Sequence, residues 1–290
     1  MIYKVSDPMK STSSLPLRYT LERTIPLVIL TIYALIALFP VVMVVMNSFK
    51  ARKAIFGAPF EFPTSETFSM VGYETVTERA AFHLYFLNSA TVTFVALILT
   101  LFIGAMAAFA LAEYDFPGNA LVALYLSIGI MIPIRLGTVG ILRLMVDLKL
   151  VNTLTGLILI YVAQSLPLTI FILSQFMRQV PKDLKDAARI DGASEYRIFG
   201  MVLPLIRPAL GAIGIFTMIP IWNDLWFPLI IAPSTRTATV TLGVQQFLGQ
   251  WVSDWNAVLS SLTLAMIPIL ILYVIFSRQM IRSITAGAIK

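Results

Sequence analysis

Long apolar runs separated by short polar segments dominate the chain. Six of these runs are close to the length that a helix needs to cross a bilayer, about 20 apolar residues. They cover residues 25–46, 84–112, 116–135, 151–177, 208–232 and 256–277. Hydrocarbon offers the backbone no hydrogen-bonding partner, so such runs are expected to be helices, whereas barrel strands would alternate over about 10 residues. The pattern predicts an all-α membrane protein built as a bundle of six transmembrane helices.

The composition agrees with this prediction and excludes other classes of protein. Hydrophobic residues make up 58% of the chain and charged residues 12%, and the mean hydropathy is +0.87. A soluble domain carries about 25% charged residues, so a soluble enzyme is excluded. The chain has no cysteine, which excludes disulfide frameworks and cysteine-ligated metals, and its single histidine, His83, cannot form a histidine cluster.

The Lys and Arg residues predict the orientation. An even number of spans puts both termini on one side, which then receives thirteen of the 21 Lys and Arg residues. Cytoplasmic loops carry the excess of positive charge. We therefore expect both termini in the cytoplasm, with residues 1–24 as an N-terminal segment there and residues 25–290 as the membrane domain. Because these loops explain the net charge of +6, nucleic acid is not expected as a partner.

One predicted cytoplasmic loop, residues 178–207, is long and charged. Pro181 suits the first turn of a helix, and Gly192 can adopt the left-handed conformation that ends one. The sequence between them therefore predicts a short helix. Two interpretations remain open on physical grounds: a solvated amphipathic loop, or a helix that sits in a cleft of another protein.

The spacing of residues in this helix predicts its faces. Leu184, Ala187, Ala188 and Asp191 follow the three- and four-residue spacing of one face, and charged residues, Lys185 among them, lie around the rest. Two alanines present almost no side-chain bulk. Another surface could therefore approach this face closely.

The same loop carries a resemblance to a known family. Its run Asp-Ala-Ala-Arg-Ile-Asp-Gly at 186–192, followed by Val-Leu-Pro at 202–204, resembles the EAA loop of ABC importer membrane subunits. This chain has Asp186 where the family has Glu, and one residue fewer between Gly192 and Pro204. In that family the loop is a coupling helix that docks into a groove on a cytoplasmic ATPase. The resemblance assigns the ATPase-coupling role to Asp186, Ala187, Ala188, Arg189, Asp191 and Gly192.

Other motifs resemble the carbohydrate-uptake permeases of this family, of the maltose-permease type, from about residue 25 to the end. They are Asn-Ser-Phe-Lys at 47–50, Leu-Asn-Ser at 87–89, Leu-Val-Asn-Thr at 150–153, Trp-Asn-Asp at 222–224 and Thr-Ala-Gly-Ala-Ile-Lys at 285–290. The resemblance implies a type I importer fold in a bacterial inner membrane. It also implies a second homologous permease, an external solute-binding protein that delivers a sugar, and an ATPase dimer that holds the ATP and Mg²⁺. No cofactor and no enzymatic activity are expected of this chain itself, which contains no G-x-x-x-x-G-K-[ST] loop for ATP.

A few polar residues in or beside the spans are candidates for the sugar path. An ionisable side chain within a span costs about 2.5–3.5 kcal/mol on insertion scales. Asp224, with Trp222 and Asn223 before it, could line the path, or it could cap or pin a helix near the outer interface while the tryptophans form an interfacial belt. Arg135 either extends to water at the interface or guides an anionic sugar derivative.

Two rival functions are weighed against the importer. An ion-gradient-driven secondary sugar transporter would need acids or a histidine relay within the membrane, and Asp224 is the only acid within a predicted span. A membrane-embedded enzyme is disfavoured because one histidine cannot supply the usual catalytic groupings without further partners. The ATP-driven importer is therefore the main hypothesis.

Overall fold

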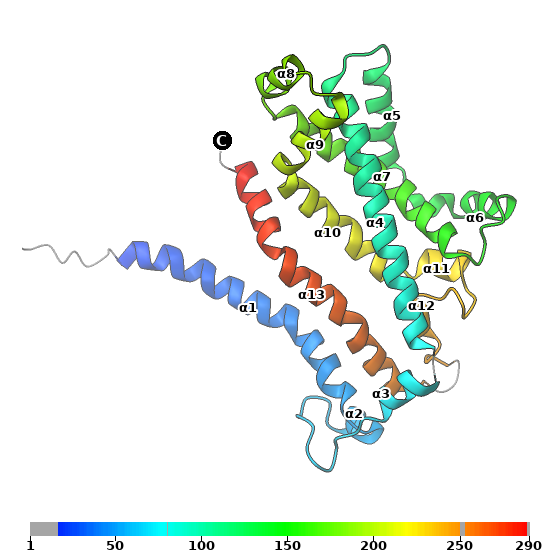
Figure 1. The fold of residues 1–290 in the computed structure, drawn as a ribbon. Helices are drawn as coiled ribbons and strands as arrows, with labels where there is room; N and C mark the ends of the chain where they lie inside the picture. Colours follow the sequence, from blue (N-terminus) through cyan, green and yellow to red (C-terminus); the bar gives the residue numbers. More distant parts are fainter. Residues whose placement is uncertain (1–16, 80, 250–252, 289–290) are drawn as a thin grey trace, which may run out of the picture.

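The computed structural model describes residues 17–79, 81–249 and 253–288, and these are mostly helical (Figure 1). Most of the predicted N-terminal segment, residues 1–16, and the last two residues of the C-terminal motif lie outside the described residues. In chain order the helices are α1 (Leu17–Ser48), α2 (Arg52–Gly57), α3 (Val71–Glu74), the π-helical turn η1 (Thr75–Arg79), α4 (Phe82–Glu113), α5 (Asn119–Met131), the 3₁₀ turn η2 (Ile134–Gly137), α6 (Thr138–Asp147), α7 (Leu154–Arg178), α8 (Lys182–Ile190), α9 (Glu195–Leu205), α10 (Arg207–Asn223), α11 (Trp226–Ile231), α12 (Val240–Gln245) and α13 (Trp255–Ala288).

Three of these helices are long and apolar enough to cross a membrane on their own. They are the Thr24–Ser48 part of α1, α4 and α7. Two bent pairs, α5 with η2 and α6, and α9 with α10, pass the same test only as pairs. The apolar Trp255–Ile271 part of α13 is shorter. The described residues thus contain three candidate spans, or up to five if each bent pair is one span. The all-α class is confirmed, and the count of six stays a prediction.

The third predicted span, 116–135, is not one straight helix. Helix α5 ends at Met131, and the chain turns by 88° into η2 and α6. Pro133 explains the turn, because it lacks an N–H group and forces Ile132 before it into an extended conformation, with ψ 118°. Helix α6 consequently projects sideways from the other helices (Figure 1).

The fifth predicted span, 208–232, is also interrupted. Helix α10 ends at Asn223, Asp224 is extended with ψ 133°, and α11 begins at Trp226. A hydropathy pattern does not reveal this break because apolar residues continue on both sides of Asp224. At its other end α10 meets α9 at an angle of 76°.

Helices α4 and α7 form the centre of the molecule. They pack against each other along their length, and the contact is close because Gly104 has no side chain: a Cβ there would lie 2.5 Å from Cγ2 of Thr169. Small or compact side chains, such as Ala108 and Leu173, are fully buried between them and the α8–α10 region. The two helices therefore behave as one packed unit.

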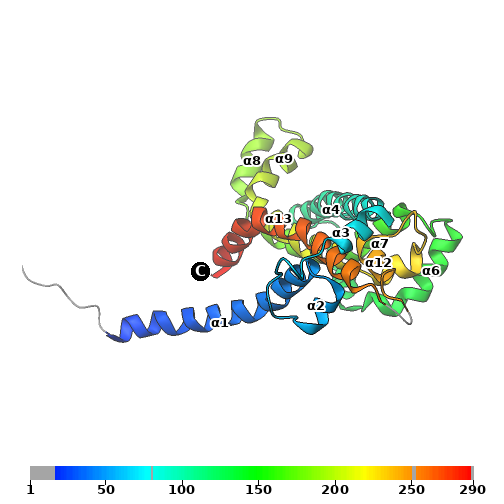
Figure 2. The same ribbon diagram turned by 90° about the horizontal axis from the view of Figure 1, so that it is seen from below.

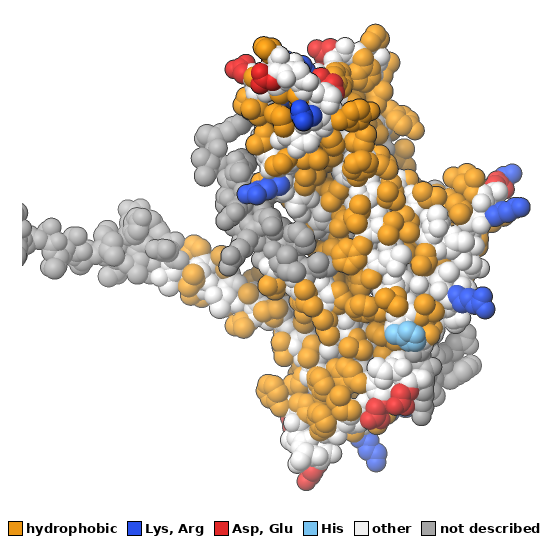
Figure 3. All heavy atoms as spheres, viewed as in Figure 1, with side chains coloured by type: hydrophobic (Ala, Val, Ile, Leu, Met, Phe, Trp, Pro, Cys, Tyr) orange, Lys and Arg blue, Asp and Glu red, His pale blue; other side chains and the backbone are white. Residues whose placement is uncertain are grey.

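Helix α1 leaves the bundle. Figures 1 and 2 show it diverging from α13, and its side chains from Ile25 to Val42 are almost all exposed. In Figure 3 charged side chains gather mainly at the α8 end, at the opposite end and on α6, while the surface between is mostly apolar. This distribution suits a protein surrounded by lipid.

Polar motifs noted in the sequence fix the loops at the end opposite α8. The Asn88 side-chain amide donates to the carbonyls of Arg236 and Ala238, at 2.9 and 3.0 Å. The Ser89 hydroxyl accepts from the Val240 N–H, and Asn152, at φ 57°, accepts from Ser234. These side chains replace the backbone hydrogen bonds that irregular segments lack.

Lys50 of the same end is buried, with 1% of its surface exposed. Its ammonium donates to the Ala58 carbonyl at 2.8 Å, and its own carbonyl accepts from Asn256 at 2.7 Å, so it ties the segment after α1 to the start of α13. Burial lowers the pKa of this ammonium, and the charge of Glu61 opposes that effect.

Candidate functional site

The charged loop contains the predicted helix. Helix α8 spans Lys182–Ile190, directly after Pro181, and Gly192 ends it with φ +77°. The Gly192 N–H donates to the Arg189 carbonyl and the Ala193 N–H to the Ala188 carbonyl, which satisfies the end of the helix. These start and stop signals are confirmed.

The faces of α8 differ from the expectation. Lys185 and Ala188 are buried, with 4% and 8% of their surfaces exposed, whereas Leu184 and Ala187 are exposed and Ile190 is 86% exposed. The two alanines therefore do not share one free face: Ala188 packs on its own chain and Ala187 points away from it. The structure buries Lys185, one of the charged residues expected around the rest of the helix, because a carboxylate far away in the sequence binds it.

That carboxylate belongs to Glu113, the last residue of α4. Lys185 and Arg189 of α8 both pair with it, Arg189 at 2.7 Å. Arg189 also pairs with Asp186 at 2.8 Å and with Glu195 at 2.9 Å. Sequence reasoning missed Glu113; the available signal was that Glu113 begins a short connection, 113–115, predicted on the same side of the membrane as the charged loop.

The pKa shifts agree with a fixed network. Hydrogen bonds to Glu195 and Glu113 raise the pKa of the Arg189 guanidinium, and the Arg189 hydrogen bond lowers the pKa of the Glu195 carboxyl. Burial, followed by a 2.7 Å hydrogen bond to Glu195, raises the pKa of the Tyr114 hydroxyl to about 12. Near neutral pH, Arg189 therefore stays positively charged, Glu195 stays negatively charged and the Tyr114 hydroxyl stays protonated.

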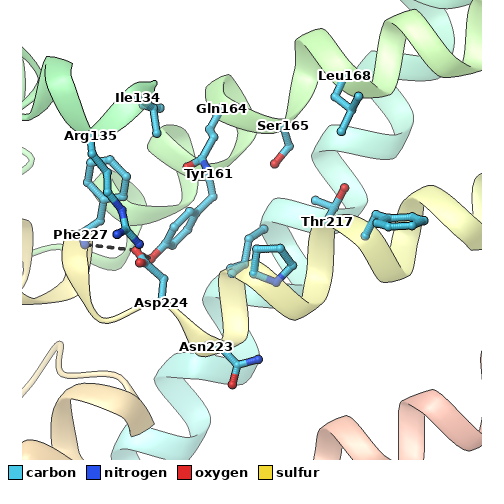
Figure 4. Close-up of a pocket in the computed structure, with 13 residues that line it drawn as sticks. Ile134, Arg135, Tyr161, Gln164, Ser165, Leu168, Thr217, Asn223, Asp224 and Phe227 are labelled. Atoms are coloured by element: carbon cyan, nitrogen blue, oxygen red, sulfur yellow. Dashed lines mark hydrogen bonds between the residues drawn. The ribbon is translucent and has the colours of Figure 1, made fainter. Parts of the chain in front are cut away.

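A second candidate site is a cavity of about 430 Å³ between η2, α7, α10 and α11 (Figure 4). Arg135 and Asp224 lie close together at one side of it, and Leu168 and Thr217 lie toward the other. Its lining residues are Ile134, Arg135, Tyr161, Gln164, Ser165, Leu168, Phe216, Thr217, Pro220, Ile221, Asn223, Asp224 and Phe227. Tyr161, Gln164 and Ser165 were not singled out from the sequence, although they are polar positions within a long apolar run.

Asp224 is a structural anchor as well as a lining residue. Its carboxylate accepts from the Tyr161 hydroxyl of α7 at 2.8 Å and from the backbone N–H groups of Trp226 and Phe227 at 3.2 and 3.1 Å. It thereby satisfies the first N–H groups of α11 and holds α7 at the break between α10 and α11. The capping alternative raised for this residue is observed, together with a place in the cavity wall.

Arg135 is one of the residues that line this cavity. Its guanidinium stacks over the Trp226 ring at 5.7 Å, and within the described part of the chain no hydrogen bond or ion pair engages it. The Trp226 indole N–H donates to Thr138 at 3.0 Å, which fixes the ring under the cation. An exposed arginine held in this way presents its N–H donors to the cavity.

Trp222 does not line this cavity. It is 3% exposed, donates its indole N–H to the Ala265 carbonyl of α13 at 3.1 Å, and packs edge-on against Phe86 of α4. Of the four residues predicted for the sugar path, the structure brings Arg135, Asn223 and Asp224 together and places Trp222 elsewhere.

Comparison with known proteins identifies the family. Residues 100–286 match the family described as the binding-protein-dependent transport system inner membrane component. The chain belongs to this family. It is a multi-pass inner-membrane transport subunit, and the resemblance to sugar-uptake ABC permeases is confirmed.

Relatives match over most of their length. The permease protein NgcG of a diacetylchitobiose uptake system from Streptomyces coelicolor is 34% identical over 265 residues, covering 90% of this chain and 87% of that protein. The permease protein AraQ of an arabinooligosaccharide transport system from Halalkalibacterium halodurans is 33% identical, with 89% and 92% covered. In a solved bacterial ABC transporter for the acidic polysaccharide alginate, one chain has a TM-score of 0.75 at 20% identity, with 94% and 99% covered, and so shares the fold.

Proposed function

We propose that the chain is the membrane subunit of an ATP-driven sugar importer and that α8 is its contact with a separate ATPase. The observation that supports this most is the asymmetry of α8. One side, with Lys185 and Ala188, is bound to its own chain, while Leu184, Ala187 and Ile190 are exposed at the end of the molecule. Exposed apolar side chains beside a fixed charge network suit a protein interface.

The remaining partners follow from the family and from α1. The description of the family implies an external binding protein. The sugars in the relatives' names support a sugar or sugar derivative as the substrate. The exposed side chains of α1 suit lipid and a second, homologous permease. Transport would follow alternating access, with the broken helices around the cavity as the elements that rearrange.

The energy source tests this proposal. The transporter is purified through a tag on this chain, with its co-purifying subunits, and reconstituted with the binding protein and labelled neutral and uronate disaccharides. Uptake is expected to require ATP and to persist when proton and sodium gradients are collapsed. Uptake that follows an ion gradient and ignores ATP would support the secondary transporter instead.

We further propose that Arg135 guides an anionic sugar. A guanidinium–carboxylate hydrogen bond contributes about 1.5–3 kcal/mol, so Arg135→Ala is expected to slow uptake of the uronate disaccharide about tenfold or more. Uptake of the neutral disaccharide should change by no more than about twofold, because only the charge-assisted bond is lost. The matched control is Arg143→Ala, at an exposed arginine of α6 that does not line the cavity. If Arg135→Ala slows uptake of both disaccharides equally, the proposal that Arg135 guides an anionic sugar is wrong.

A further inference from the structure

Glu113 occupies a position where a carboxylate is costly. It ends α4, where the helix dipole disfavours negative charge, and its side chain is only 9% exposed. A buried charge is tolerated only when it is paired, and here two cations pair with it. Both come from α8, more than seventy residues later. We call Glu113, Lys185 and Arg189 the Glu113 cluster.

The cluster gives α8 a second attachment to the membrane helices. The first is covalent, because α7 leads into α8 through three residues, 179–181. The second is the cluster, which joins α8 directly to the end of α4. Arg178 reinforces it by donating to the Leu111 carbonyl of α4 at 3.3 Å. A displacement of α8 therefore acts on α4 and α7 together.

Helix α7 leads from the cluster to the cavity, whereas α4 leads to the contact between Phe86 and Trp222, which lies outside the cavity lining. The two helices are closely packed against each other. Tyr161 of α7 holds Asp224, and Phe86 of α4 packs on Trp222. Two packed helices with fixed contacts at each end transmit a displacement better than a flexible loop.

We propose that Glu113 is a positioning residue that makes movement of α8 move α4. The proposal rests on the proposed contact between α8 and an ATPase. With Glu113 neutralised, α8 would still meet the ATPase, but part of its displacement would be lost before it reaches α4. Hydrolysis would then continue with less transport.

The test is the ratio of sugar taken up to ATP hydrolysed, in the reconstituted transporter with the same disaccharides. Glu113→Gln is expected to lower this ratio about tenfold, since Lys185 and Arg189 lose their ionic partner and α8 loses its attachment to the end of α4. Asp115→Asn, at an exposed acid two residues away, is the matched control and should leave the ratio unchanged. The exchange Glu113→Lys with Lys185→Glu should recover about threefold over either single variant.

A cysteine cross-link from Ala187→Cys to the ATPase, measured in the same preparations, separates the two proposals. A cross-link that persists in Glu113→Gln together with a lowered ratio supports the positioning role. A persistent cross-link with a wild-type ratio, no recovery in the exchanged pair, or variants that fail to assemble at all would overturn it. A missing cross-link in the assembled protein with Glu113 intact would overturn the proposed ATPase contact first.

Discussion

Asp186→Lys combined with Gly192→Pro is expected to reduce ATP-driven sugar uptake by about 100-fold, the loss expected when an interaction essential to the transport cycle is removed. Gly192 has φ +77°, whereas proline fixes φ near −65°, so the reversal after α8 cannot form. Proline also removes the N–H that donates to the Arg189 carbonyl. Asp186→Lys places a cation beside Arg189, with which Asp186 pairs at 2.8 Å.

Capture of sugar by the separate binding protein should be unchanged in this variant, because no residue of α8 lies near the opposite end of the molecule (Figure 1). The matched control is Asp115→Lys, which introduces the same charge in the short connection between α4 and α5. Uptake and binding are measured on the same reconstituted vesicles. Uptake within about twofold of the unmodified protein would contradict the coupling role, since the helix end would then be dispensable.

Asp224→Ala is expected to have the second-largest effect, this time on stability. It leaves the Tyr161 hydroxyl and two backbone N–H groups of α11 without their acceptor. Losing a cap and leaving buried donors unsatisfied costs about 2–4 kcal/mol. The unfolding midpoint of the purified assembly should fall by several degrees, and uptake should fall with it.

Three variants separate this role from others. Asn223→Ala is the neighbouring control, because among the described residues the Asn223 amide donates within its own helix, α10, to the Ile219 carbonyl at 2.9 Å. Tyr161→Phe removes one hydrogen bond, worth about 1 kcal/mol, and a double-mutant cycle with Asp224→Ala should show coupling. Asp224→Asn retains one acceptor oxygen and should be milder than Asp224→Ala. Equal stability of Asp224→Ala and Asn223→Ala would contradict the anchoring role.

Local signals predicted local structure well. The start and end of α8 follow from Pro181 and Gly192, whose conformational preferences act within a few residues. The burial of Lys185 could not be predicted in this way, because its partner Glu113 lies 72 residues away. Only packing of α4 against α7 brings the two charges together.

Hydropathy predicted where the helices lie but not where they break. Pro133 and Asp224 interrupt two runs that remain apolar on both sides, so the hydropathy pattern does not locate the breaks. Trp222 was predicted to line the path together with Asn223 and Asp224, which follow it in the sequence. Because a helix has 3.6 residues per turn, neighbouring side chains point in different directions, and that of Trp222 points toward α4 and α13 instead of into the cavity.

The central claim is that α8 receives the force from a separate ATPase, and cross-linking tests it most directly. The chain has no cysteine, so each introduced cysteine is unique. In the assembled transporter, Leu184→Cys and Ala187→Cys, on the exposed side, should cross-link to the ATPase, and Ala188→Cys, on the buried side, should not. An assembly that hydrolyses ATP and transports sugar, but in which neither exposed position cross-links to the ATPase, would contradict the account.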